Sequence, residues 1–319
     1  MSSPHRGLRP EPGERGLAST DAAEVAALLG GAWDALIDVA GRVDLDAPTR
    51  LEGWNARDVL VHLGSWGPST PLEERADDAR TGRVRSEDDA DARNAMVVAS
   101  HHDAGLPEIQ GALRAARDRA LSFLASDDAE VVGRRWVGSM VGELPMTGVL
   151  AAQAYELAVH ALDLRPAGLT EVPEPLLDAG TGALVDVAGA LAARQGMTET
   201  FALCTPSGCW ATGTADRAWT TVRLDPGVQA SALGWPAITG SAPDVLDAAA
   251  GRAVAVRLLA TRRLRLHDHP RVLNLLVSIG SAPGFPAGSA VQASLRALAQ
   301  TGRVAGRLGD RLTGALSRR

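Results

Sequence analysis

Hydrophobic residues recur at helical spacing in four segments of the first half of the chain. The segments are residues 21–43, 55–64, 107–125 and 147–164. Apolar side chains fall at every third or fourth position in each of them, which is typical of helices that bury one face. The first two begin with a capping-box pattern, since Asp21 is followed by Glu24 and Asn55 by Asp58. Four amphipathic helices predict an N-terminal helical bundle.

The second half of the chain has a different pattern. A further helix is predicted over 175–194, after which short apolar segments alternate with Gly, Pro and Ser, as is typical of strands. The predicted strands are 201–205, 210–213, 219–224 and 253–259, with a helix over 243–251. The fold class expected from this order is α+β, a four-helix bundle followed by a small α+β domain.

The same pattern divides the chain into five parts. They are a flexible lead-in (1–19), a helical bundle (20–170), a connecting helix (171–196), an α+β domain (197–285) and an Arg-rich helical tail (286–319). The stretch 67–104 has little apolar pattern and holds nine acidic residues against five arginines. It is long for a connection in a compact bundle, and we expect a lid or a solvated excursion there.

Composition narrows the classes of partner. The formal net charge is -6 over 319 residues, which argues against nucleic acid, because phosphate backbones are bound through clustered basic residues. The chain has no uninterrupted run of about 18 apolar residues, the length that spans a bilayer. Its N-terminal segment has no apolar stretch resembling a signal peptide, so the predicted location is cytoplasmic, without a membrane partner. Cys204 and Cys209 flank a turn, and they are expected to be free thiols because the cytosol is reducing.

The segment 147–164 carries one polar stripe on an otherwise apolar helix. Its members, three and four residues apart, are Gln153, Glu156, His160 and Asp163. A helix this apolar is expected to be buried, where an ionised glutamate costs several kcal/mol unless it is paired or bound to a cation. The stripe therefore requires a charged partner.

The segment 55–64 offers a partner, because His62 lies among Val59, Leu60, Val61 and Leu63. Metal sites in bundles are assembled from side chains of facing helices. Three ligands of the His, Glu and His type suit zinc and leave a fourth position open. We therefore predict that His62, Glu156 and His160 bind a divalent metal, zinc before others, with Asp58 or Asp163 as acceptor for an imidazole N–H.

Spacing alone leaves a simpler interpretation open. A glutamate four residues before a histidine can pair with it on the helix surface, and a single histidine on an apolar face is often a core residue. The remaining histidines, in 101–102 and 267–269, lie in segments that read as solvated surface.

Two runs of sequence, taken together, resemble a known family. They are Gly-Trp-Asn-Ala-Arg-Asp-Val-Leu-Val-His-Leu at 53–63 and Tyr-Glu-Leu-Ala-Val-His-Ala-Leu-Asp-Leu at 155–164. Together they resemble the mycothiol-dependent maleylpyruvate isomerase family, over about residues 20–280. The resemblance implies a DinB-like four-helix bundle followed by a sterol-carrier-like α+β domain, which agrees with the predicted order of helices and strands.

The resemblance also implies a site. It places zinc on His62, Glu156 and His160, and mycothiol as the thiol cofactor. A catalytic arginine of the C-terminal part corresponds to Arg252, which follows the segment 240–251. Four more arginines lie nearby in sequence, so this last assignment is the less specific one.

The function expected from these features is a zinc-dependent, mycothiol-using isomerase or S-transferase acting on a small electrophilic substrate. An open zinc site lowers the pKa of a bound thiol, and an arginine can hold a substrate carboxylate. Two alternatives stay open at this point. One is a thiol-independent zinc hydrolase or biosynthetic enzyme, and the other is a non-catalytic ligand-binding protein.

Overall fold

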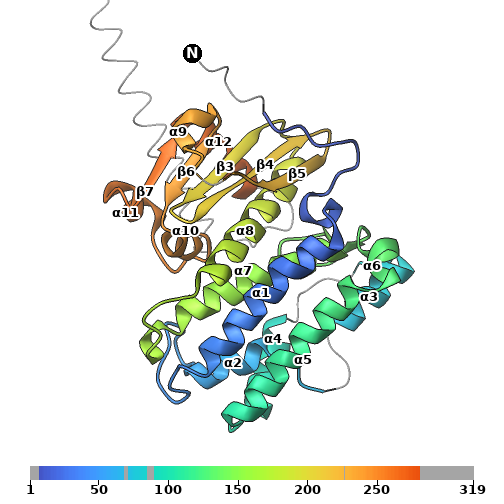
Figure 1. Ribbon diagram of the computed structural model, residues 1–319, viewed down its shortest axis with the longest axis vertical. Coiled ribbons are helices and arrows are strands. Elements are labelled where there is room, and N and C mark those ends of the chain that lie inside the picture. The colour runs from blue at the N-terminus through green and yellow to red at the C-terminus, as the bar shows by residue number, and fades with distance from the viewer. Residues whose placement is uncertain (1–6, 68–70, 85–89, 226, 281–319) are drawn as a thin grey trace, which may run out of the picture.

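The computed structural model describes residues 7–67, 71–84, 90–225 and 227–280, and it places a helical bundle beside a domain built on a sheet (Figure 1). The predicted tail 286–319 lies outside these residues. The mixed α+β class and the order of the two parts are confirmed.

The four predicted bundle helices are present with nearly the expected limits. They are α1 (Ala22–Ala40), α2 (Ala56–Leu63), α5 (Leu106–Leu124) and α7 (Met146–Asp163). Their caps follow the sequence: the Asp21 side chain accepts from the backbone N–H of Ala23, and Asn55 and Asp58 form the predicted capping box. Helix α1 packs on both α5 and α7, while α2 packs on α5.

The stretch 67–104 is more ordered than its composition indicates. It contains α3 (Pro71–Thr81) and α4 (Ala90–Ser100). Among the described residues of these two helices, only α3 has buried ones, so a lid or a solvated excursion stays a prediction. Helix α3 buries Ala76, Asp78 and Ala79, small or polar residues that give no apolar signal in a sequence. The short helix α6 (Asp127–Val132) and the strands β1 (Trp136–Val137) and β2 (Leu144–Pro145) complete this part.

Helix α8 (Glu174–Arg194) connects the two parts of the molecule. It runs between α7 and α1 on one side and the sheet on the other (Figure 1). Gly180 lies against Ala158 of α7, and Gly182 lies against the ring of Trp210 in the sheet. Among the described residues, α8 is also the one helix long and apolar enough to cross a membrane, but most of its apolar window is buried inside the protein. Its hydropathy is that of a core helix.

The larger sheet has the strand order β5-β4-β3-β6-β7. Its strands are β3 (Thr200–Thr205), β4 (Gly208–Ala215), β5 (Ala218–Arg223), β6 (Ala237–Gly240) and β7 (Leu264–His267). All neighbours are antiparallel except β3 and β6. The helices α9 (Ala230–Leu233), α10 (Ala242–Ala249), α11 (Ala255–Ala260) and α12 (His269–Gly280) accompany it.

One predicted strand and the predicted thiols are wrong. Residues 253–259 mostly form helix α11, because the short run of alternating Ala and Val is compatible with either structure. Cys204 and Cys209 form a disulfide, and the described residues include no free cysteine. The register explains the pairing, since the two cysteines are direct partners across β3 and β4.

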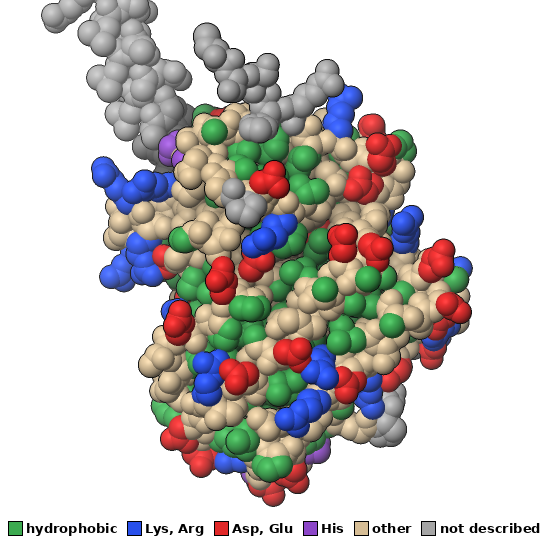
Figure 2. Space-filling model, in the orientation of Figure 1, with side chains coloured by type: hydrophobic (Ala, Val, Ile, Leu, Met, Phe, Trp, Pro, Cys, Tyr) green, Lys and Arg blue, Asp and Glu red, His purple; other side chains and the backbone are tan. Residues whose placement is uncertain are grey.

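The predicted flexible lead-in is wrong at its last residues. Gly16–Ser19 form a 3₁₀ helix, η1, in which Leu17 and Ala18 are buried. The backbone N–H of Leu17 donates to the buried carboxylate of Asp186 on α8. Residues 16–19 thus pack on the helix that joins the two parts of the molecule. On the face drawn in Figure 2, acidic and basic side chains are interspersed over the bundle.

Candidate metal centre

The short helix α2 presents His62 in its last turn. The capping box holds the start of this helix, because the backbone N–H of Asp58 donates to Asn55 at 2.9 Å and that of Asn55 donates to Asp58 at 3.0 Å. Trp54 packs edge-on against the imidazole of His62, with ring centroids 5.6 Å apart. The local sequence therefore sets both the length of the helix and the surroundings of the ring.

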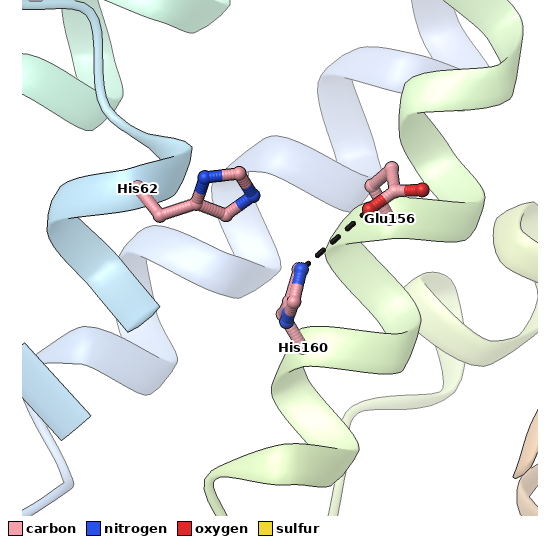
Figure 3. Close-up of side chains that lie close together, drawn as sticks. All are labelled: His62, Glu156 and His160. Atoms are coloured by element: carbon pink, nitrogen blue, oxygen red, sulfur yellow. Dashed lines mark ion pairs between the residues drawn. The ribbon is translucent and has the colours of Figure 1, made fainter. Parts of the chain in front are cut away.

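Helix α7 presents Glu156 and His160 one turn apart toward His62 (Figure 3). His160 is buried, whereas the Glu156 side chain is half exposed, so the expectation that the whole stripe is buried is wrong for Glu156. His160 Nε2 lies 3.5 Å from Glu156 Oε2. One ligand atom from each of His62, Glu156 and His160 falls within 4.8 Å of the other two. The three predicted ligands are thus together at the edge of the bundle.

The donor set fits a metal ion. Two imidazoles and one carboxylate are borderline ligands suited to zinc, and three protein ligands leave a position for an exchangeable group. A simple helical pair between Glu156 and His160 does not require a third donor, yet a second helix brings His62 to the same point. The His62 ring is largely enclosed, and its Nδ1 is a buried polar atom without a hydrogen-bond partner in the described part of the chain.

The two imidazoles differ in their proton affinity. Burial, together with repulsion from His160, lowers the pKa of His62 to about 4, so this ring is neutral at pH 7. Burial acts in the same direction on His160, but hydrogen bonds to Asp163 and Glu156 outweigh it and raise the pKa of His160 to about 9. Burial acts to raise the pKa of Glu156, and contact with His160 lowers it on balance. The centre thus offers one neutral imidazole and one carboxylate without any proton loss.

A family model identifies the bundle. Residues 26–165 match the family described as mycothiol maleylpyruvate isomerase N-terminal domain. The N-terminal part of this chain is thus similar to that domain. The match spans both runs of sequence that resemble the family and all three residues of the cluster.

Solved structures give a weaker likeness over a longer part of the chain. The crystal structure of a mycothiol-dependent maleylpyruvate isomerase is 19% identical, with a TM-score of 0.46, and the alignment covers 75% of this chain and 92% of that chain. A histidine-to-alanine mutant of a mycothiol-dependent maleylpyruvate isomerase is 18% identical, with the same coverage and a TM-score of 0.43. The chain matches none of the curated proteins.

Within the bundle, the carboxylate beside His160 Nδ1 belongs to Asp163. Its side chain is fully buried, and its Oδ2 lies 3.2 Å from His160 Nδ1. Burial acts to raise the pKa of Asp163, but hydrogen bonds from His160 and Arg252 lower it, so Asp163 is ionised. Asp58, the other predicted acceptor, is engaged in its capping box instead. A hydrogen bond of this kind fixes which imidazole nitrogen is free to bind a metal.

Arg252 contacts the bundle although it comes from the sheet part of the molecule. Its Nε donates to Asp163 Oδ1 at 3.2 Å and its Nη2 to Asp163 Oδ2 at 3.3 Å. The side chain keeps about a third of its surface exposed, so further N–H groups are available to a ligand. Arg263, one of the neighbours in sequence, pairs with Asp244 instead.

Two charged residues beside the centre could not be recognised from any local pattern in the sequence. Arg50, in the loop between α1 and α2, donates to Asp163, and Asp247 of α10 accepts from Arg50. These partners are 113 and 197 residues apart, so no local pattern joins them. The remaining histidines make other contacts: His101 stacks on Trp66 at 4.1 Å, and His267 Nε2 lies 3.2 Å from Thr239 Oγ1.

Proposed function

We propose that the chain is a zinc-dependent enzyme that uses mycothiol either to isomerise a small electrophilic substrate or to form a thioether with it as an S-transferase. One observation carries the proposal: His62, Glu156 and His160 converge within 4.8 Å inside a domain of the mycothiol maleylpyruvate isomerase family. Zinc is favoured over other divalent metals because of the two imidazoles. The bundle 20–170 and the sheet domain 197–285 are the proposed domains of this enzyme, with 171–196 between them.

In this proposal, each residue of the centre has a separate role. Zinc in an open site supplies acidity, which lowers the pKa of a bound thiol toward neutrality. His62, Glu156 and His160 hold the ion, and Asp163 keeps the His160 ring oriented through its Nδ1. Trp54 packs edge-on against the His62 ring and supports its position.

Arg252 is the proposed catalytic residue. The contacts of its Nε and Nη2 with Asp163 fix the plane of the guanidinium. The N–H groups that remain can donate to a carboxylate or to a developing enolate oxygen of the substrate, and such charge-assisted bonds are short and strong. This role suits an electrophile with a carboxylate or with a carbonyl next to its double bond, and it fits thiol addition better than hydrolysis.

The variant His62→Ala tests the metal assignment. We expect the purified variant to lose stoichiometric zinc and thiol-dependent activity while α7 and the bundle stay folded, because only one of three ligands is removed. Zinc content by mass spectrometry, circular dichroism and turnover of maleylpyruvate with mycothiol are the measurements. His102→Ala, which removes an exposed histidine, is the matched control. Full zinc content in His62→Ala contradicts the ligand assignment.

The thiol is tested separately. Zinc-loaded wild-type protein is titrated with mycothiol by calorimetry, and we expect saturable binding that is absent from the metal-free protein. Zinc without thiol binding would favour the thiol-independent hydrolase, whereas a protein that holds zinc but turns over neither maleylpyruvate nor a general electrophile would favour a binding protein.

A further inference from the structure

Asp163 is the meeting point of three cationic or proton-donating groups. His160 Nδ1 lies 3.2 Å from its Oδ2, and the guanidinium groups of Arg50 and Arg252 lie 3.1 Å and 3.2 Å from its Oδ1. The carboxylate has no exposed surface. Its orientation therefore depends on the two arginines, because water does not reach it to replace either contact.

Arg50 is held from its far side by the sheet part of the molecule. Its Nη1 and Nη2 donate to the two carboxylate oxygens of Asp247, each at 2.8 Å. This is the bidentate geometry in which a guanidinium and a carboxylate fix each other's plane. The backbone N–H of Arg50 also donates to the carbonyl of Asp163 at 3.1 Å, so the loop itself is attached to the end of α7.

Asp247 holds the second arginine as well. Its carbonyl accepts from the backbone N–H of Arg252 at 2.8 Å and from that of Ala253 at 3.0 Å. One residue of α10 thus fixes Arg50 through its side chain and the segment of Arg252 through its backbone. Both arginines then converge on Asp163, directly beside the imidazole of His160.

We propose that Asp247 and Arg50 are positioning residues through which the sheet part orients the His160 imidazole for metal binding. The inference rests on the proposed metal function. Asp247 touches none of the three ligands and acts through Arg50 and Asp163, which hold His160 Nδ1 so that Nε2 faces Glu156 and His62 (Figure 3). Outer-shell partners of this kind contribute about 10- to 100-fold to metal affinity.

The test compares Asp247→Asn with Asp244→Asn, both on helix α10. Asp247→Asn keeps the size of the side chain but removes the charge that binds Arg50. Asp244→Asn removes the charge that pairs with Arg263, which is not connected to Asp163. The dissociation constant of zinc alone is measured for each full-length protein by competition with a chromogenic chelator. We expect about tenfold weaker binding for Asp247→Asn and a value within about twofold of wild type for Asp244→Asn.

A second variant separates positioning from folding. Arg50→Lys keeps the positive charge but loses the bidentate geometry, and it is expected to weaken zinc binding severalfold while thermal unfolding stays close to that of wild type. In NMR spectra of the zinc-loaded protein, the His160 Nδ1–H resonance is expected to broaden in Arg50→Lys and Asp247→Asn and to stay sharp in Asp244→Asn. Wild-type zinc affinity in Asp247→Asn and Arg50→Lys overturns the positioning role alone, whereas a wild-type protein that takes up no zinc overturns the proposed function itself.

Discussion

At the scale of single residues, Asp186 is the most isolated buried charge outside the metal centre. It lies on α8, and its Oδ1 accepts from Leu17 N, Trp219 Nε1 and Thr221 Oγ1. No cation is among these partners, and burial raises the pKa of its carboxyl although the three hydrogen bonds oppose the rise. The residue therefore holds η1, α8 and β5 together at the cost of a desolvated carboxylate.

Two substitutions separate the charge of Asp186 from its role as acceptor. Asp186→Ala leaves three buried donors without a partner and is expected to lower the free energy of unfolding by about 3 kcal/mol. Asp186→Asn keeps an oxygen for the donors and removes the charge, so its cost at pH 7 is expected to be much smaller. Urea unfolding of the three proteins is the measurement, and equal losses in both variants would contradict the assignment.

The pH dependence of the same residue has a definite sign. Because the folded-state pKa is raised, the native state binds the proton more tightly than the unfolded state does. The stability from this group is fully present below its unfolded pKa of about 4 and is lost as pH rises through the folded value. Wild type is therefore expected to lose stability relative to Asp186→Asn between about pH 4 and pH 7, as measured by urea unfolding at both values.

The residues of the metal centre show what local sequence can predict. His62, Glu156 and His160 stand out because polar side chains interrupt apolar helical faces, and that signal requires no knowledge of distant contacts. Arg50 and Asp247 give no such signal, because their contact joins a loop and a helix that are far apart in sequence and meet only in the folded protein. The prediction of free thiols at Cys204 and Cys209 is wrong because it gives the reducing compartment more weight than the turn that makes the two residues partners across β3 and β4.

At the scale of elements, the close contact between α7 and α8 depends on a glycine, which has no side chain, at position 180 of α8. A Cβ at Gly180 would lie 2.5 Å from the Cβ of Ala158 and 3.2 Å from the carbonyl of Ala154. Both neighbours are on α7, and Ala158 lies between the two proposed ligands Glu156 and His160 in sequence. The close approach of α8 therefore helps to set the position of the helix that carries them.

Gly180→Ala is expected to destabilise the protein even though alanine favours helices. The gain in helix propensity is about 1 kcal/mol, while a Cβ forced into a close-packed contact costs about 1–3 kcal/mol, so a net loss follows. The matched control is Gly111→Ala on α5, where a Cβ meets nothing within 4 Å and a small gain is expected. Thermal unfolding of both variants checks the opposite signs, and a gain in Gly180→Ala would contradict the packing argument.

The wrong predictions of secondary structure concern segments whose sequence pattern fits a helix as well as a strand or a loop. Helix α11 was predicted as a strand because alternating Ala and Val over a short run have no distinct period. Helix α3 was missed because its buried face is made of alanines and an aspartate. The capped and strongly periodic helices α1, α2, α5 and α7 were predicted to within a few residues.

At the scale of the whole molecule, α8 makes the two parts interdependent. It packs on α7 and α1 as well as on β4 and β5, so the loss of either part would expose an apolar helix. The polar network of Arg50, Asp163, Asp247 and Arg252 crosses the same boundary. We therefore expect the bundle and the sheet part to unfold in one transition rather than two.

Zinc provides a test of this interdependence. A ligand that binds only the folded state stabilises it by RT ln(1 + [L]/Kd), about 2.7 kcal/mol at a hundredfold excess over Kd, which corresponds to a rise in Tm of about 5 °C. Near-ultraviolet dichroism monitors the sheet part through Trp210 and Trp219, and far-ultraviolet dichroism monitors the helices. If the two parts unfold together, zinc is expected to raise the Tm by the same amount in both signals. The shift is expected to vanish in His62→Ala and to persist in His102→Ala. A metal-dependent shift confined to the helical signal would show that α8 does not couple the two parts, and an undiminished shift in His62→Ala would place the zinc elsewhere.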